Sequence, residues 1–185
     1  MALLGRDDPF PEQLNRVVVA GACGAGKSTV AAAVATELGF PYVELDSLYP
    51  GPGWVPRPSF ESDVADLAES AQWVTEWQYQ LARPVLAARA DLLVFLDLPR
   101  WLAVSRVVRR TVKRMLLRTE LWEGCREPPL RKLFTDRDHI IRWAWRTYPE
   151  HEPRVRDLMR QQPALPIVWL KTRRDVKIWL IRLSR

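Results

Sequence analysis

The residues whose types and spacing point most directly to chemistry lie near the start of the chain, in the stretch Gly21-Ala22-Cys23-Gly24-Ala25-Gly26-Lys27-Ser28. Its three glycines permit backbone angles that turn consecutive N–H groups toward the oxygens of a phosphate. In a Walker A motif of this pattern, the lysine reaches the β- and γ-phosphates of a nucleotide and the serine hydroxyl binds Mg²⁺. The sequence therefore predicts an ATP site over residues 21–29, in which Lys27 is also catalytic, Ser28 holds the metal and Thr29 bonds the α-phosphate.

The segments around this loop decide between a phosphate site and an ordinary glycine-rich turn that contains a lysine. Residues 16–20 form a short β-branched run, which is typical of a strand buried on both faces. Residues 27–38 are mostly good helix formers, and Gly39 stands where the C-terminal residue of a helix is expected. A helix that begins at the loop directs its positive end at the phosphates, so the context favours the nucleotide site.

Four further apolar runs indicate strands, at residues 42–45, 73–75, 92–96 and 167–170. Helix-forming segments at 59–70, at 81–89 and from about 175 alternate with them, and such alternation predicts parallel strands with helices on both sheet faces. We therefore expect an α/β fold with three layers and a five-stranded parallel sheet. The whole chain, 1–185, would be one domain, with a polar lead-in at 1–15 and an Arg- and Trp-rich insertion at about 105–150 that covers the substrate as a lid.

Three acidic residues, Asp46, Glu76 and Asp97, follow directly on predicted strands. Ligands of an open parallel sheet bind beyond the carboxyl ends of the strands, so these acids would lie near the phosphate loop. Each is a candidate for Mg²⁺ coordination, for holding a substrate hydroxyl or for general base action, and each is alternatively a helix cap or turn former. We favour a functional role for Asp46, also on the metal, and for Glu76, and a capping role for Asp97.

The segment from Arg100 to Arg118 carries seven cations and no acid. Arg106, Arg110 and Arg114 recur at helical spacing, which predicts an amphipathic helix with one basic side. Arginines on a closing element neutralise the charge that develops during phosphoryl transfer, so Arg110 and Arg114 are candidate catalytic residues. The alternatives are a solvated helix face and a nucleic-acid surface, and no motif beyond charge favours the latter.

Composition limits the remaining classes of protein. A net charge of +6 fits an anionic partner, whether nucleotide, acidic protein or nucleic acid. The only cysteines, Cys23 and Cys125, match neither a disulfide framework nor a zinc site. No apolar run approaches the roughly 20 residues that span a bilayer, and Arg6, Asp7 and Asp8 do not fit a secretory signal. We expect a cytoplasmic protein without a membrane segment.

The aromatic residues and histidines carry weaker signals. Of the nine tryptophans, Trp54 and Trp77 lie near loops beyond predicted strands, where an indole would stack on a base or cover a substrate. A capping box at 135–138 would open a helix carrying Trp143 and Trp145. His139 and His151 fit no catalytic or metal-binding pattern, so we expect both to be structural or exposed.

Several segments together resemble the adenylate-kinase-like P-loop proteins known as DNA topology modulation (FlaR-like) proteins. The features that carry the resemblance are Gly-Ala-Gly-Lys-Ser-Thr at 24–29, Leu-Asp-Ser-Leu-Tyr at 45–49 with Pro-Gly-Trp at 52–54, Phe-Leu-Asp-Leu-Pro-Arg at 95–100, Glu-Gly-Cys-Arg-Glu at 123–127 and Trp-Ala-Trp at 143–145. They follow the family's order from about residue 16 onward. The resemblance implies strands in nucleoside-kinase order, a nucleotide at the Walker A loop and a lid containing or adjoining Arg106, Arg110, Arg114 and Arg118.

One segment departs from the family pattern. The resemblance implies Asp-Gly-Asn-Tyr after the third predicted strand, where this chain has Glu76-Trp77-Gln78-Tyr79. The acid and the tyrosine are kept, and an indole replaces glycine at a place where substrate would approach.

Two functions follow from these features. The first is a small-molecule kinase that uses ATP and Mg²⁺ to phosphorylate a nucleoside, nucleotide or other hydroxyl- or phosphate-bearing acceptor. The second is a nucleotide-dependent regulatory or binding protein whose basic lid contacts nucleic acid or a protein partner. The Walker A loop supports both, and the acids and arginines near it favour the kinase.

Overall fold

A computed structural model describes residues 3–49, 57–116, 120–122, 125–126 and 139–184, with only the backbone for 120–122 and 125–126. Among these residues, six parallel strands form one sheet in the order β1-β8-β5-β2-β4-β3. The strands are β1 (Leu3–Leu4), β2 (Arg16–Gly21), β3 (Tyr42–Val43), β4 (Trp73–Glu76), β5 (Leu92–Leu96) and β8 (Ile167–Leu170). The α/β class and the parallel sheet are confirmed.

The sheet has one strand more than the five predicted. Leu3 and Leu4 pair in parallel with Ile167 and Val168 and so form β1 at the edge beyond β8. The prediction of residues 1–15 as a polar lead-in is therefore wrong at its start. Two apolar residues give no periodic signal on their own, and they become a strand because β8 offers them a free edge.

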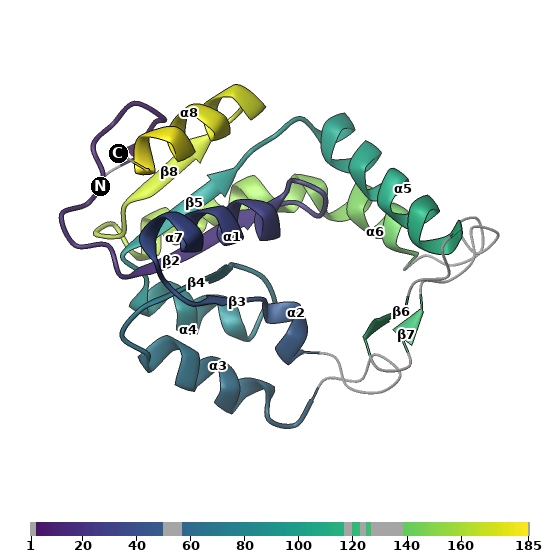
Figure 1. Cartoon of the computed structure of the whole chain (residues 1–185), viewed down its shortest axis with the longest axis horizontal. Coiled ribbons are helices and arrows are strands. Elements are labelled where there is room, and N and C mark those ends of the chain that lie inside the picture. Colours follow the sequence, from purple (N-terminus) through teal and green to yellow (C-terminus); the bar gives the residue numbers. More distant parts are fainter. Residues whose placement is uncertain (1–2, 50–56, 117–119, 123–124, 127–138, 185) are drawn as a thin grey trace.

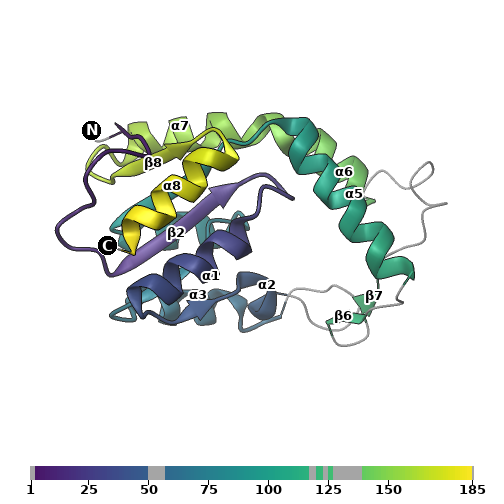
Figure 2. The same cartoon turned by 45° about the horizontal axis from the view of Figure 1, so that its top comes forward.

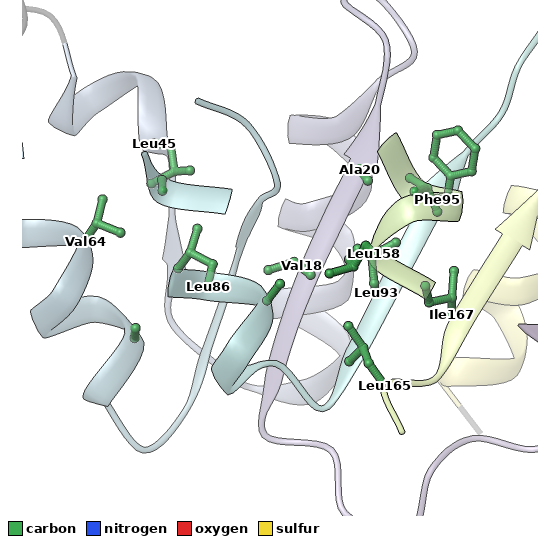
Figure 3. Packing of buried hydrophobic residues seen from close by; sticks show 14 of the residues in the cluster. Val18, Ala20, Leu45, Val64, Leu86, Leu93, Phe95, Leu158, Leu165 and Ile167 are labelled. Atoms are coloured by element: carbon green, nitrogen blue, oxygen red, sulfur yellow. The ribbon is translucent and has the colours of Figure 1, made fainter. Parts of the chain in front are cut away.

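Helices cover both faces of the sheet (Figures 1 and 2). Val17 and Val19 of β2 belong to the cluster on the side of α1 (Lys27–Leu38) and α8 (Arg173–Leu183). Val18 and Ala20 belong to the cluster on the other face, which Figure 3 shows in close view. That face is covered by α3 (Phe60–Glu69), α4 (Ala82–Arg89) and α7 (His151–Gln161). Successive residues of β2 point to opposite faces, and the continuous apolar run is the signature of a strand buried on both.

Strand order places the phosphate loop at the switch point of the sheet. From β2 the chain passes to β3 and β4 on one side, and β5 then pairs with the other side of β2. Ligands of doubly wound sheets bind at the carboxyl end of the strands where this reversal occurs. Residues 22–26, which follow β2, occupy that position.

The second predicted strand is shorter than expected. It was predicted over 42–45, but β3 ends at Val43 and the helix α2 (Leu45–Leu48) follows. The backbone N–H of Leu45 donates to Oε2 of Glu76 instead of to a neighbouring strand. Asp46 therefore lies in the first turn of α2 rather than at a strand end.

The predicted basic helix is α5 (Arg100–Leu116), which precedes the hairpin of β6 (Glu120–Trp122) and β7 (Cys125–Arg126). The helix α6 (Ile140–Thr147) packs beside α5, and the short helix η3 (Tyr148–Glu150) joins it to α7. Figure 1 shows α5 and α6 extending beyond the carboxyl ends of the strands.

His139 caps α6, because its side chain accepts a hydrogen bond from the N–H of Ile141. The predicted capping box at 135–138 lies outside the described residues, as do Trp54, Arg118 and the side chain of Cys125. Within the described part of the chain, no helix combines the length and the apolar character needed to cross a bilayer.

Candidate functional site

The glycine loop joins the end of β2 to the start of α1. Gly24 and Gly26 have φ angles of 81° and 100°, which L side chains rarely adopt, and this explains why both positions carry glycine. No side chain caps α1 at its N-terminus. The N–H groups of its first turn therefore have no partner within the helix, which is the arrangement that binds phosphate oxygens. Residues 22–26 thus form a glycine loop that leads directly into α1, and the assignment of residues 21–29 to ATP stays a prediction.

The basic helix α5 lies directly against this loop. A Cβ added to Gly24 would stand 2.2 Å from the carbonyl oxygen of Ala103 and 2.8 Å from Cγ2 of Val107. Gly24 is thus glycine for two independent reasons, its backbone angle and the close approach of α5. Sequence reasoning found only the first of them.

Arginines of α5 contact the loop from the same side. Nη1 of Arg106 donates to the carbonyl oxygens of Ala25, at 2.9 Å, and of Gly24, at 3.3 Å. Nη2 of Arg110 lies 3.6 Å from Sγ of Cys23. Burial and the nearby charge of Arg173 lower the pKa of Arg106. The predicted proximity of basic helix and phosphate loop is therefore present, and Arg106 is held by backbone carbonyl groups.

Glu76 ends β4 and is fully buried, with 1% of its surface exposed. Its Oε1 accepts a hydrogen bond of 2.6 Å from the Tyr42 hydroxyl, and its Oε2 accepts one of 3.2 Å from the N–H of Leu45. Both oxygens are therefore used to join β3, β4 and α2.

Tyr42 connects this carboxylate to the phosphate loop. Burial, followed by the hydrogen bond and the charge of Glu76, raises the pKa of Tyr42, and a hydrogen bond with the Ser28 side chain acts in the opposite direction. The hydroxyl therefore stays protonated at neutral pH and serves as a donor. Sequence reasoning did not single out Tyr42, because a tyrosine on a short strand usually only packs.

Asp46 is held by two side chains that follow β4. Its Oδ1 accepts hydrogen bonds of 2.6 Å from Nε2 of Gln78 and 2.6 Å from the Tyr79 hydroxyl. Burial first, and then the charge of Asp46, raises the pKa of Tyr79, so this hydroxyl also stays protonated. The structure thus brings Asp46 and Glu76 into neighbouring positions, as expected, but gives their oxygens different partners.

A third acid, Glu44, lies in the same region. Burial raises the pKa of Glu44, and the nearby charges of Glu76 and Asp46 add to the effect, while Arg114 lowers it. The charge of Arg114, predicted as catalytic, therefore acts on this acidic region. Sequence reasoning missed Glu44, although its position two residues before Asp46 was a usable signal.

The end of β5 borders a small cavity of about 80 Å³ that Ala22, Asp97, Tyr148, His151 and Glu152 line. Asp97 accepts a hydrogen bond of 2.9 Å from Nε1 of Trp169, so its side chain serves the sheet rather than the helix cap that we predicted. His151 is half-buried, and its buried Nε2 has no partner among the described residues. Burial, and then the charges of Lys27, Arg154 and Arg83, lower the pKa of His151 to about 3.

Trp77, which stands where the resemblance to the FlaR-like proteins implies glycine, packs into the structure. Its Nε1 donates to the carbonyl oxygen of Arg83 at 3.0 Å, and the ring packs against the buried cluster on the α3, α4 and α7 face. The guanidinium of Arg83 lies 5.7 Å from the ring centroid. The indole is thus half-buried and bonded, and its predicted role, to stack on a base or cover a substrate, stays a prediction.

The two oxygen donors predicted for Mg²⁺, Ser28 and Asp46, suit an ion that is bound together with a nucleotide. Mg²⁺ takes one or two protein oxygens and completes its shell with phosphates and water. The Ser28 hydroxyl and the second oxygen of Asp46, Oδ2, for which no hydrogen bond is found among the described residues, are ligands of this kind. No group of three His, Cys, Asp or Glu side chains among the described residues converges as a metal site of protein ligands alone would require.

The sheet order, the glycine loop and the helix that follows it define a P-loop kinase-like fold. A gluconokinase from Sinorhizobium meliloti 1021 shares this fold, with a TM-score of 0.52 and 21% identity over 92% of this chain and 93% of that one. A shikimate kinase from Acinetobacter baumannii has a TM-score of 0.47 and 20% identity over 94% and 95% of the two chains. A deoxyadenosine kinase from M. mycoides has a TM-score of 0.45 and 14% identity over 91% of this chain and 98% of that one.

No family model matches the chain, and no curated protein is similar to it in sequence. At such identities the likeness to solved structures concerns the fold alone.

Proposed function

We propose that this protein is a small-molecule kinase that transfers the γ-phosphoryl group of ATP to a hydroxyl- or phosphate-bearing acceptor of nucleoside or nucleotide type. The observation that carries the proposal is the meeting of three elements at one end of the sheet. These are the uncapped start of α1, the basic helix α5 against the loop and the acids around α2. Phosphoryl transfer needs such positioning and electrostatic stabilisation more than covalent chemistry by the protein. The finer resemblance to the FlaR-like proteins is part of this proposal.

The phosphate loop would hold the nucleotide. Backbone N–H groups of residues 21–29 donate to phosphate oxygens, Lys27 neutralises the β- and γ-phosphates, and Thr29 bonds the α-phosphate. Ser28 and Asp46 would hold Mg²⁺, which would supply further charge neutralisation on the phosphates. The acceptor oxygen forms a bond to the γ-phosphorus while the bond from phosphorus to the ADP oxygen breaks, and a hydroxyl acceptor releases its proton to water.

The other predicted site residues take different parts in this proposal. Asp46 is the acid we assign to the reaction centre, because Glu76 has both oxygens bonded and serves to hold α2. Arg110 reaches the loop beside Cys23, and the charge of Arg114 acts on Glu44. Both would neutralise the transferring group when residues 105–150 close over the acceptor as a lid.

An acceptor panel tests the proposal directly. Wild-type protein with MgATP is incubated with nucleosides, nucleotides, sugars and sugar acids, and acceptor-dependent ADP formation is measured. We expect turnover with at least one acceptor and a loss of at least 100-fold in Lys27→Ala, since removal of one stabilising group costs about 10²–10³ in rate. Lys177→Ala, an exposed lysine of α8, is the matched control and should be unchanged. ATP binding without any acceptor-dependent ADP formation would contradict the proposal.

A second candidate is the nucleotide-dependent binding protein, and the exposed aromatic residues of the basic helices favour it. Trp101 and Trp145 are 69% and 53% exposed, and a groove beside Trp145 is lined by Val104, Ile141, Arg142 and Arg146. Exposed indoles among cations are suited to stack on unpaired bases. In this case single-stranded nucleic acid should bind with steep salt dependence, and Trp101→Ala with Arg109→Ala should weaken it about tenfold. Filter retention that these substitutions leave unchanged would remove this candidate.

A further inference from the structure

Two side-chain hydrogen-bond donors orient the carboxylate of Asp46. Gln78 and Tyr79 are adjacent in sequence, and both donate at 2.6 Å to the same oxygen, Oδ1. When one oxygen of a carboxylate accepts two hydrogen bonds in this way, the plane of the carboxylate is fixed. The other oxygen then points in a defined direction.

The backbone that delivers Tyr79 is in an unusual conformation. Tyr79 has a φ angle of 59°, and no other non-glycine residue in the described part of the chain has a positive φ. A bulky residue in this region is a conformational outlier that only a strong local arrangement retains. Residue 79 adopts it while its hydroxyl reaches Asp46 and its ring packs against its neighbours.

An aromatic cluster holds that ring in place. The Tyr79 ring stacks on Tyr49 with centroids 4.0 Å apart, and both rings meet the edge of Phe60 at 5.4 Å and 5.0 Å. The Tyr49 hydroxyl has no hydrogen bond among the described residues, whereas that of Tyr79 is bonded to Asp46. The two tyrosines thus share a packing role, and Tyr79 alone has the polar one.

The helix that carries Asp46 is tied to the phosphate loop on its other side. The N–H of Leu45 is bonded to Glu76, and Glu76 is bonded to Tyr42, which neighbours Ser28. Asp46 is therefore fixed from two directions, through α2 and through residues 78 and 79.

We propose that Gln78 and Tyr79 are positioning residues for Asp46, which hold Oδ1 so that Oδ2 is presented to the Mg²⁺ bound with ATP. The inference rests on the proposed function for the presence of MgATP, but it does not depend on which acceptor is used. It assigns a specific role to Gln78 and Tyr79. The indole of Trp77, which is bonded to Arg83, does not interfere with that role.

The experiment measures ATP affinity by calorimetry in the presence of Mg²⁺ and again with EDTA, and takes the ratio of the two as the metal-dependent gain. Tyr79→Phe keeps the ring and removes only the hydroxyl, and Gln78→Leu removes the other donor. Residues that hydrogen-bond to a metal ligand typically change metal affinity by about 10–100-fold. We therefore expect the metal-dependent gain in ATP affinity to be about tenfold smaller in each variant than in the wild type. Affinity with EDTA should stay within about twofold, which a merely structural role would not preserve.

Tyr49→Phe is the matched control, since it removes a hydroxyl from the same cluster without touching Asp46, and its gain should be unchanged. Asp46→Asn should abolish the gain, and adding Tyr79→Phe to it should have no further effect. The inference is overturned if Tyr79→Phe behaves like Tyr49→Phe, if it weakens metal-free binding equally, or if it still acts in the Asp46→Asn background. Wild-type protein that binds no MgATP would overturn both proposals, whereas intact metal-dependent binding without turnover would remove only the kinase.

Discussion

The acidic residues near the phosphate loop differ in whether their carboxylate oxygens already accept hydrogen bonds inside the protein. Glu76, a carboxylate that looks catalytic by its place at a strand end, has both oxygens bonded inside the protein. Asp46, three positions after Val43, keeps an oxygen available for a ligand. The type of residue at a strand end therefore predicts less than the partners that surround it.

The structural role of Glu76 gives a prediction about stability. Glu76→Gln replaces a buried acceptor by an amide that presents N–H groups toward the donors of Tyr42 or Leu45. We expect a loss of about 2 kcal/mol in the free energy of unfolding, within the usual cost of an unsatisfied buried polar group. Urea denaturation measures it, with Glu37→Gln on the exposed surface of α1 as a control that should change little. Equal stability of the two variants would show that these hydrogen bonds contribute nothing.

His151 gives a prediction about pH. Its folded pKa is about 3, whereas an unfolded histidine titrates near 6.5. Between these two pKa values, His151 binds a proton in the unfolded chain but not in the folded chain. The free energy of unfolding therefore falls as pH decreases below about 6.5. From pH 7 to pH 5.5 the loss should be about 1 kcal/mol.

Chemical denaturation at the two pH values checks this expectation, and His151→Gln should remove the extra loss. The other acids and bases titrate in the wild type and in the variant alike. The difference between the pH dependences of their free energies of unfolding therefore reports on His151. A wild type whose pH dependence equals that of the variant would contradict the low pKa.

At the scale of elements, α5 packs closely against the phosphate loop at Gly24. Gly24→Ala would place a methyl group 2.2 Å from the backbone of α5 at a φ angle of 81°. We expect a loss of about 3 kcal/mol, the sum of backbone strain and overpacking, together with weaker ATP binding.

Gly39→Ala provides the matched comparison. Gly39 has a φ angle of 71°, but nothing lies within 4 Å of an added Cβ, so only the strain of about 1 kcal/mol remains. Thermal denaturation and ATP titration measure both variants. If Gly24→Ala costs no more than Gly39→Ala, α5 does not press on the loop in solution.

Elements with a strong pattern were predictable from sequence, and those created by partners were not. The strands β2 and β5 and the helix α1 follow from continuous apolar runs and from the glycine motif between them. The two-residue β1 and the four-residue α2 are too short to show a period, and each depends on a distant partner, β8 and Glu76 respectively. For the same reason the loop residues of the site were found, while the donors to Asp46 and the second reason for Gly24 were not.

At the scale of the whole molecule, the fold gathers cations and acids near one loop. Arg106 and Arg110 of α5 contact the loop directly, while Glu44 acts on Tyr42, and Asp46 acts on Glu44. Arg114, further along α5, also acts on Glu44. The proposed kinase would use this mixture of charges to bind a nucleotide together with its cation.

The edge strand β1 has a consequence for how the protein can be handled. It covers the outer edge of β8, and Arg6 nearby is bonded to Asp175 and, through its carbonyl oxygen, to Arg182 of the last helix. Figure 1 shows both ends of the chain on this side of the molecule. Trimming the first few residues would expose the backbone of Ile167 and Val168, in an apolar strand that could then pair with another copy. Shortened versions of the chain should therefore self-associate, and affinity tags belong on spacers that leave Leu3 and Leu4 in register.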